Sequence, residues 1–115
     1  MMEIQELEKE LMQKNKWLYM KLEEQKSLIQ KASESERNYR IALATKMLKL
    51  KAEGMQATLI PDVARGDKGV ADLKFERDVA VGVVKHCISA IQSCQATMSG
   101  VQSLISTRRA EMKLL

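Results

Sequence analysis

Apolar residues recur at alternating steps of three and four over residues 70–115, which is the spacing of a helix with one packed seam. Twelve of the fourteen seam positions are apolar, and the two exceptions are Arg77 and Arg108. In the middle of the segment the flanking positions are apolar as well, for example at Val81 and Ile88. A stripe of that width is typical of a helix that faces more than one neighbour.

A second helical pattern covers residues 3–53, which are dense in charge and contain no Gly or Pro. A seven-residue repeat of mainly apolar residues runs from Ile4 to Leu18, and a second one, shifted by four, runs from Leu22 to Leu50. An insertion of four residues into a repeat of seven unwinds a supercoil locally without breaking the helix. We therefore expect one long helix whose buried seam shifts at Leu22.

Between the two patterns, residues 54–69 hold three of the five glycines and the only proline. We expect Gly54 and Gly66 to end helices with positive φ. Thr58 is expected to cap a short helical turn, and Asp67 to cap the helix that follows. The segment predicts a compact corner.

Together these patterns predict an all-α fold in which residues 1–115 form one helical-hairpin domain. A helix over about 3–53 and a helix over about 70–113 should pack antiparallel, joined by a short helical corner over about 54–69. Two helices cannot enclose the wide stripe, so we expect the hairpin to self-associate, as a dimer or a larger oligomer, into a coiled-coil-like bundle. The oligomer core is expected at five seam positions: Val84, Cys87, Ile91, Cys94 and Met98.

Composition supports this fold class and also bears on the cellular compartment in which we expect the protein. With four aromatic residues, five Gly and one Pro in 115 residues, the chain lacks the usual residues of a small β-sandwich or barrel. At 45% hydrophobic residues, it is too apolar for a disordered tail. The two cysteines do not form a disulfide framework, and the first residues lack the order of a signal peptide, so we expect a cytoplasmic protein.

A stretch without charge runs from His86 to Thr107 and is long enough to span a bilayer. Ser, Gln and Thr are scattered through it, and no long run of large apolar residues occurs. We therefore expect a helix enclosed by other helices and no membrane partner.

No pattern for catalysis or for a cofactor is found in the sequence. His86 is the only histidine, and no Ser-His-Asp, HExxH, Walker or GxGxxG arrangement is present. Cys87 and Cys94 are seven apart, whereas structural zinc sites use closer cysteine pairs and four ligands. The sequence therefore predicts a protein that is not an enzyme and binds no metal and no cofactor.

The formal net charge is +4, which permits but does not require an acidic partner. The stretch Arg37–Lys51 holds five basic residues and no acid, and with Tyr39 it could contact phosphates or a base. A solvated helix face with Tyr39 packed in the seam is the simpler interpretation. Because loops on rigid scaffolds commonly bind partners, we predict partner binding at the corner and the adjoining helix. The residues are Asp62, Arg65, Lys68, Arg40, Lys46 and Lys49.

The segments NYRIALATKMLKLKAEGMQATLIPDVARGD and VADLKFERDVA resemble small helical proteins encoded by phages and prophages of Gram-positive bacteria, often among early genes. The resemblance covers roughly residues 34–105. It implies an accessory role in the host cytoplasm, either in phage DNA metabolism or in blocking a host process such as antiviral defence.

The favoured hypothesis is an oligomeric, non-enzymatic accessory protein that binds a host or phage protein. Two alternatives remain open. The first is a nucleic-acid-binding accessory protein of phage replication or recombination, against which the modest charge counts. The second is a binder of a small nucleotide signal with its pocket between protomers near the corner, against which the scarcity of aromatic residues counts.

Overall fold

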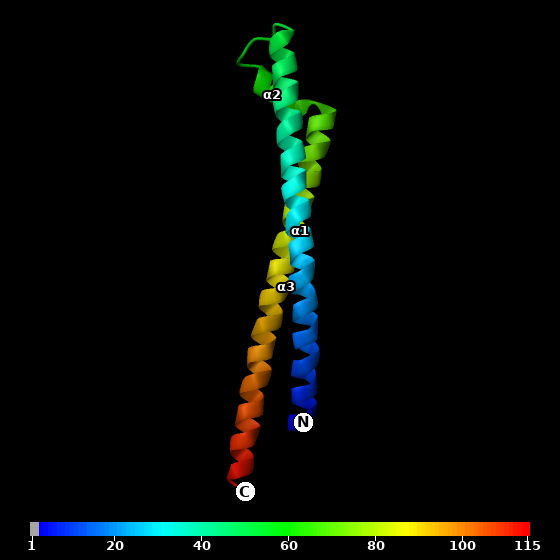
Figure 1. Ribbon diagram of the computed structural model, residues 1–115. Helices are drawn as coiled ribbons and strands as arrows, with labels where there is room; N and C mark the ends of the chain where they lie inside the picture. The colour runs from blue at the N-terminus through cyan, green and yellow to red at the C-terminus, as the bar shows by residue number, and fades with distance from the viewer. Residues whose placement is uncertain (1–2) are drawn as a thin grey trace. The chain divides into compact units, whose positions relative to one another are not determined.

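A computed structural model describes residues 3–115, which form three helices. These are α1 (Ile4–Ala52), α2 (Ile60–Gly66) and α3 (Lys68–Lys113), and no strand occurs in the described range. The helices α1 and α3 run antiparallel, and the short α2 follows the end of α1 (Figure 1). The predicted all-α hairpin with a helical corner is confirmed, with α3 beginning two residues earlier than expected.

The sequence of α1 favours a helix along its whole length, because it is rich in Leu, Lys, Glu, Gln and Ala and lacks Gly and Pro. Ion pairs one turn apart form along it, such as the half-buried Lys14–Glu10 at 3.6 Å and the exposed Lys26–Glu23 at 3.1 Å. Exposed pairs of this kind each contribute only about 0.3–0.5 kcal/mol. The stability of the helix must therefore come mainly from packing.

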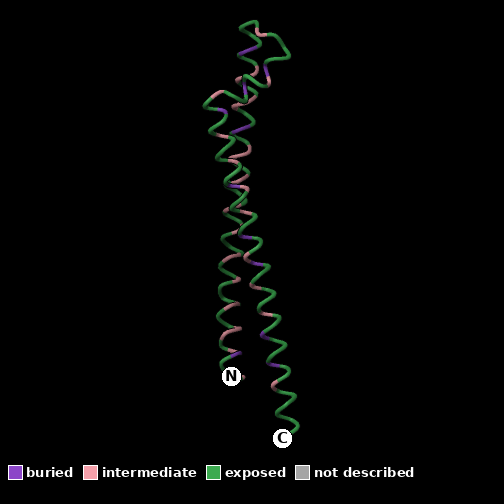
Figure 2. Tube along the Cα trace, turned by 180° about the vertical axis from the view of Figure 1, so that it is seen from behind, coloured by how far each residue is buried: buried purple, intermediate pink, exposed green. Residues whose placement is uncertain are grey.

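The chain gathers into two compact units, and each unit combines a part of α1 with a part of α3. Of the described residues, unit 1 comprises 3–26 and 86–115, and unit 2 comprises 27–85 with the whole of α2. In each unit, buried and half-buried residues lie along the sides where the two long helices face one another (Figure 2). Each unit thus has its own stretch of the seam.

Unit 1 is held by an apolar cluster and by two cysteine thiols. Leu7, Val101 and Ile105 are buried together, with Ile4 and Leu11 packed against them. The Cys87 thiol donates to the Lys21 carbonyl at 3.8 Å, and the Cys94 thiol to the Lys14 carbonyl at 3.7 Å. Both thiols are free and serve as small seam residues that approach the α1 backbone.

The repeat predicted on α3 is borne out by burial: every seam position from Val70 to Arg108 is buried or half-buried. The five residues assigned to an oligomer core belong to this seam. Cys87 and Ile91 are buried, and the other three are half-buried: Val84, Cys94 and Met98. Packing within one chain already covers much of their surface, and their burial by a second chain stays a prediction.

The seam on α1 does shift, but later than predicted: Leu43 and Leu50 of the shifted repeat are half-buried and buried. Beyond Leu18 the half-buried positions continue in the original repeat through Lys21 and Gln25, whereas Leu22 and Ile29 are exposed. Long polar side chains can occupy seam positions because their apolar stems pack while their ends reach water.

The structure of the corner confirms some of the predicted helix ends and contradicts others. Gly54 has φ +84°, and the Met55 N–H donates to the Leu50 carbonyl at 3.1 Å, which closes the end of α1. Gly66 has no positive φ, so that prediction is wrong, because the chain leaves α2 through the extended backbone of Asp67. The predicted cap at Thr58 is also wrong.

The N-terminal cap of α2 is instead Leu59, which offers no side-chain hydrogen bond to the helix. Pro61 stands in the first turn of α2, where it has no N–H that needs a partner. The start of α2 therefore requires less capping than the sequence pattern implied.

The two glycines of the corner provide a matched stability test. A Cβ at Gly54 would touch nothing within 4 Å, so the cost of Gly54→Ala comes from the positive φ alone. We expect Gly54→Ala to lower the free energy of unfolding by about 1–2 kcal/mol. Gly66→Ala should be neutral or stabilising by up to about 1 kcal/mol, because Gly66 is helical and a Cβ there is also unobstructed. Urea denaturation measures both, and equal effects would contradict the geometry of the corner.

Candidate functional site

The corner of unit 2 is fixed by a small apolar cluster. Leu50 of α1 and Ile60 and Ala64 of α2 are buried together, and Ala64 has no exposed surface. The side chains packed against this cluster are Leu43, Met47 and Met55. The inner face of α2 is thereby held against the end of α1, and its outer residues are presented on a rigid support.

Asp67 links the corner to both long helices. The Val70 N–H donates to Asp67 Oδ2 at 3.2 Å, which confirms the predicted cap of α3. The ammonium of Lys46 on α1 lies 3.4 Å from Asp67 Oδ1. The bond from Val70 lowers the pKa of the Asp67 carboxyl, and Lys46 lowers it further. The ionised carboxylate therefore favours the folded arrangement of the start of α3.

All six residues predicted to bind a partner lie in unit 2, but they differ in the ion pairs and hydrogen bonds that they make within the chain. Lys46 is paired with Asp67, and Arg40 donates to Glu36 at 2.7 Å. Arg65 lies 3.8 Å from Asp62 on α2, and the Asp62 side chain remains 90% exposed. Two exposed residues make no ion pair within the described chain: Lys49 and Lys68. The structure therefore leaves five of the six outside the contacts between elements: Arg40, Lys49, Asp62, Arg65 and Lys68.

A shallow groove of about 390 Å³ adjoins the corner. Lys46 and Lys49 line it from α1, and Asp67, Gly69 and Leu73 line it from the start of α3. Cationic groups are present there, but none of the residues lining this fully described groove is aromatic. The groove thus offers no stacking partner for the base of a nucleotide signal.

The positive charge of the chain is concentrated around this corner. Residues 37–69 contain seven Lys and Arg against three Asp and Glu, which gives a net charge of +4. Because the whole chain also has +4, the remaining residues are neutral in sum. This net charge lies in residues 37–53, so the end of α1 beside the corner is the part of the molecule that attracts acidic partners most strongly.

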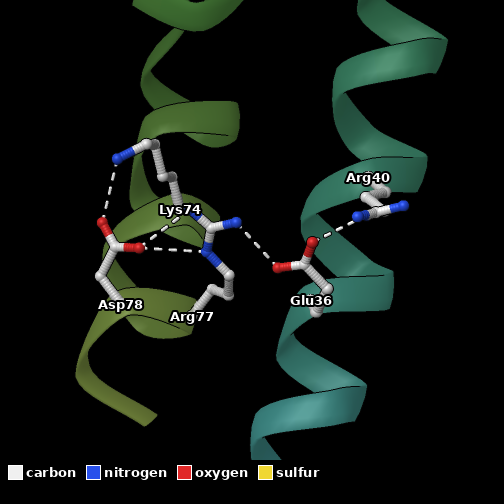
Figure 3. A network of polar contacts seen from close by, with 5 residues as sticks. All are labelled: Glu36, Arg40, Lys74, Arg77 and Asp78. Carbon is white, nitrogen blue, oxygen red and sulfur yellow. Dashed lines mark hydrogen bonds and ion pairs between the residues drawn. The ribbon is translucent and has the colours of Figure 1, made fainter. Parts of the chain in front are cut away.

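A polar network joins α1 and α3 below the corner (Figure 3). Arg77 of α3 donates to Glu36 of α1 at 2.8 Å, and Arg77 also bonds Asp78 at 3.0 Å. Arg77 and Arg40 both lower the pKa of Glu36 through hydrogen bonds, Arg77 first. Glu36 interrupts the apolar repeat of α1 and Arg77 interrupts that of α3, and these two charges thus satisfy one another across the seam.

Tyr39 lies in the same seam and is buried, with the Arg77 guanidinium 5.0 Å from its ring centre. Its ring is therefore engaged within the chain, as the simpler interpretation of the basic stretch expects. The stretch Arg37–Lys51 offers cations to a partner but no free aromatic ring.

Sequence analysis missed a second groove, of about 290 Å³, on unit 2. Its walls are Leu28, Lys31 and Ser35 of α1 and, on α3, Phe75, Glu76, Val79, Ala80 and Val83. Phe75 lies outside the heptad seam and is 71% exposed. The signal in the sequence is the spacing of Phe75, Val79 and Val83, since residues four apart share one face of a helix.

Comparison of the chain with protein-family models, with curated proteins and with solved structures finds no match. Across residues 3–115, no helix is both long and apolar enough to cross a membrane. Within the same range, no three His, Cys, Asp or Glu side chains are grouped so that they could hold a metal ion.

The role of Asp67 leads to a prediction about pH. A carboxyl whose pKa is lowered by folding stabilises the protein above its unfolded pKa, near 3.9, and loses that contribution as the pH falls through its folded pKa. Asp67→Asn should therefore lower the melting temperature at pH 7, and its difference from the parent should shrink below about pH 4. Thermal melts monitored by circular dichroism measure this.

The matched control is Asp72→Asn, which removes an exposed carboxylate that makes no ion pair within the described chain. Its effect should be smaller at pH 7. If both variants melt alike at every pH, Asp67 does not hold the start of α3.

Proposed function

We propose that this chain is a non-enzymatic, phage-type accessory protein that self-associates and acts by binding another macromolecule, in the first place a host or phage protein. The corner of unit 2 is the proposed binding surface. One observation carries this: α2 is fixed by its own buried cluster, while its outer side presents side chains that this packing does not use. Binding residues commonly occupy such a position on a rigid scaffold.

The mixture of groups on α2 favours a protein partner. Leu59 and Val63 are exposed at 51% and 42%, and they flank the charged Asp62. Protein interfaces combine apolar contact area with a polar rim. We propose that the protein acts in the host cytoplasm, and its two free cysteines support this. If it inhibits a host process such as antiviral defence, such a protein would do so by binding its target protein.

A nucleic acid is the second candidate partner, and the concentration of the net charge in residues 37–69 favours it. Phosphate contacts by Lys and Arg make binding fall steeply with salt. Binding to a protein through α2 should depend less on salt, because apolar side chains contribute to it. A salt titration therefore separates the two candidates.

The test of the proposal changes Asp62, Arg65 and Lys68 to Ala together. None of the three is buried and none caps a helix, so the variant should fold like the parent. We expect its affinity for a partner isolated from host extract with the parent protein to fall at least about tenfold, a loss of about 1.4 kcal/mol. Surface plasmon resonance with the purified partner measures it.

The matched control changes Glu6, Lys9 and Lys16 to Ala, which removes the same charges from exposed positions of α1 in unit 1. Its affinity should equal that of the parent. An unchanged affinity of the corner variant would show that the corner is not the binding surface.

A further inference from the structure

The groove beside Phe75 in unit 2 has the features of a protein-binding surface. None of the residues that line it belongs to the corner. Phe75 is 71% exposed, and Val79 and Val83, on the same face of α3, are 50% and 42% exposed. A large aromatic side chain beside a groove is the usual anchor of an interface. The groove has a volume of about 290 Å³ and is lined mainly by apolar side chains, which suits the side chains of a protein partner.

The charges at the groove identify the occupant. Lys31 lines it from α1 and Glu76 lines it from α3, and neither makes an ion pair within the described chain. In a contact between two copies related by a two-fold axis, if one residue of the first copy contacts a second residue of the other copy, the reverse contact also forms. Lys31 of each copy can therefore face Glu76 of the other, so the surface is complementary to itself.

The groove on the other side of this helix pair lacks that property. Ile29, Val81 and Val84 line it, and its one charged residue is Lys85. A second copy placed there would add positive charge to positive charge. Of these two grooves, the charges thus favour the one beside Phe75.

The chain as a whole exposes enough area for an interface of standard size. A compact monomer of 13.0 kDa exposes roughly 6,300 Å². This chain exposes 8596 Å². The excess of about 2,300 Å² exceeds the roughly 800 Å² that each partner of a standard stable interface buries.

From these observations we infer that a second copy of this chain occupies the groove beside Phe75, in a two-fold contact that buries Phe75, Val79 and Val83 of both copies. Lys31 of each copy pairs with Glu76 of the other. This inference rests on the proposed self-association, but it places the contact at Phe75, Val79 and Val83 instead of the five seam positions expected from the sequence, which are buried or half-buried within one chain. It leaves the corner of each copy free for another partner.

The first test measures the mass of the purified full chain by light scattering and the dimer Kd by analytical ultracentrifugation. The parent should have twice the mass of 13.0 kDa at micromolar concentration. Phe75→Ala should raise the dimer Kd at least about tenfold. Because Phe75 is mostly exposed in one chain, the variant should keep its helical circular dichroism.

The second test uses the symmetry. Lys31→Glu and Glu76→Lys should each weaken the dimer at least about tenfold, because two like-charged pairs then face each other. Mixed in equal amounts, the two variants should recover a dimer, since every pair across the axis again has opposite charges. An ion pair within one chain could not produce this recovery. The control is Lys85→Glu on the other groove, which should leave the Kd unchanged.

Each contrary result overturns a different statement. A parent that stays at 13.0 kDa would refute self-association and this contact together, leaving the groove to a different protein. A dimeric parent whose Kd is insensitive to Phe75→Ala, or whose charge variants fail to recover on mixing, would refute this contact alone. A change in Kd with Lys85→Glu would move the interface to the other groove. Partner capture by the corner is read separately, so its failure is distinguishable from all three.

Discussion

The seam between α1 and α3 is the constraint on which the rest of this structure depends. Neither long helix has a globular core to pack against, and exposed ion pairs along α1 contribute little. Each helix is therefore stabilised mainly by the face that it presents to the other. In unit 1 that face is the cluster around Leu7, and in unit 2 it includes the buried Tyr39 and Val70. The position of every surface group within a unit follows from this pairing.

Polar contacts set the register that apolar packing leaves loosely defined. Arg77 meets Glu36 across the seam, and Lys46 meets Asp67 at the start of α3. Breaking such pairs leaves a partly buried charge without its partner, so slipped registers are disfavoured. The same contacts position the corner of unit 2. Its capacity to bind a partner therefore depends on residues that would never touch that partner.

The sequence was sufficient to predict the hairpin, the α3 repeat, the positive φ of Gly54 and the cap at Asp67, because each follows from local spacing or backbone chemistry. It was insufficient for features that depend on which faces the two helices turn to one another. Leu22 and Ile29 fit the shifted repeat of α1 but are exposed, because the seam shifts only after them, where Leu50 is buried. Of the candidate site, the basic corner was recognisable, whereas the groove beside Phe75 requires knowing which face of α3 the seam uses.

The central claim is that the seam forms within one chain, so that the surfaces of each unit remain available for association. Methyl NOEs between Leu7 and Ile105 of unit 1 test it most directly, because these two side chains belong to one buried cluster. Methyl-labelled chain is unfolded, refolded with a tenfold excess of unlabelled chain, and compared with fully labelled protein. If the seam is intramolecular, the NOE per labelled chain is unchanged by dilution. A roughly tenfold loss of that NOE would show that α1 pairs with α3 of another chain, and would contradict this account.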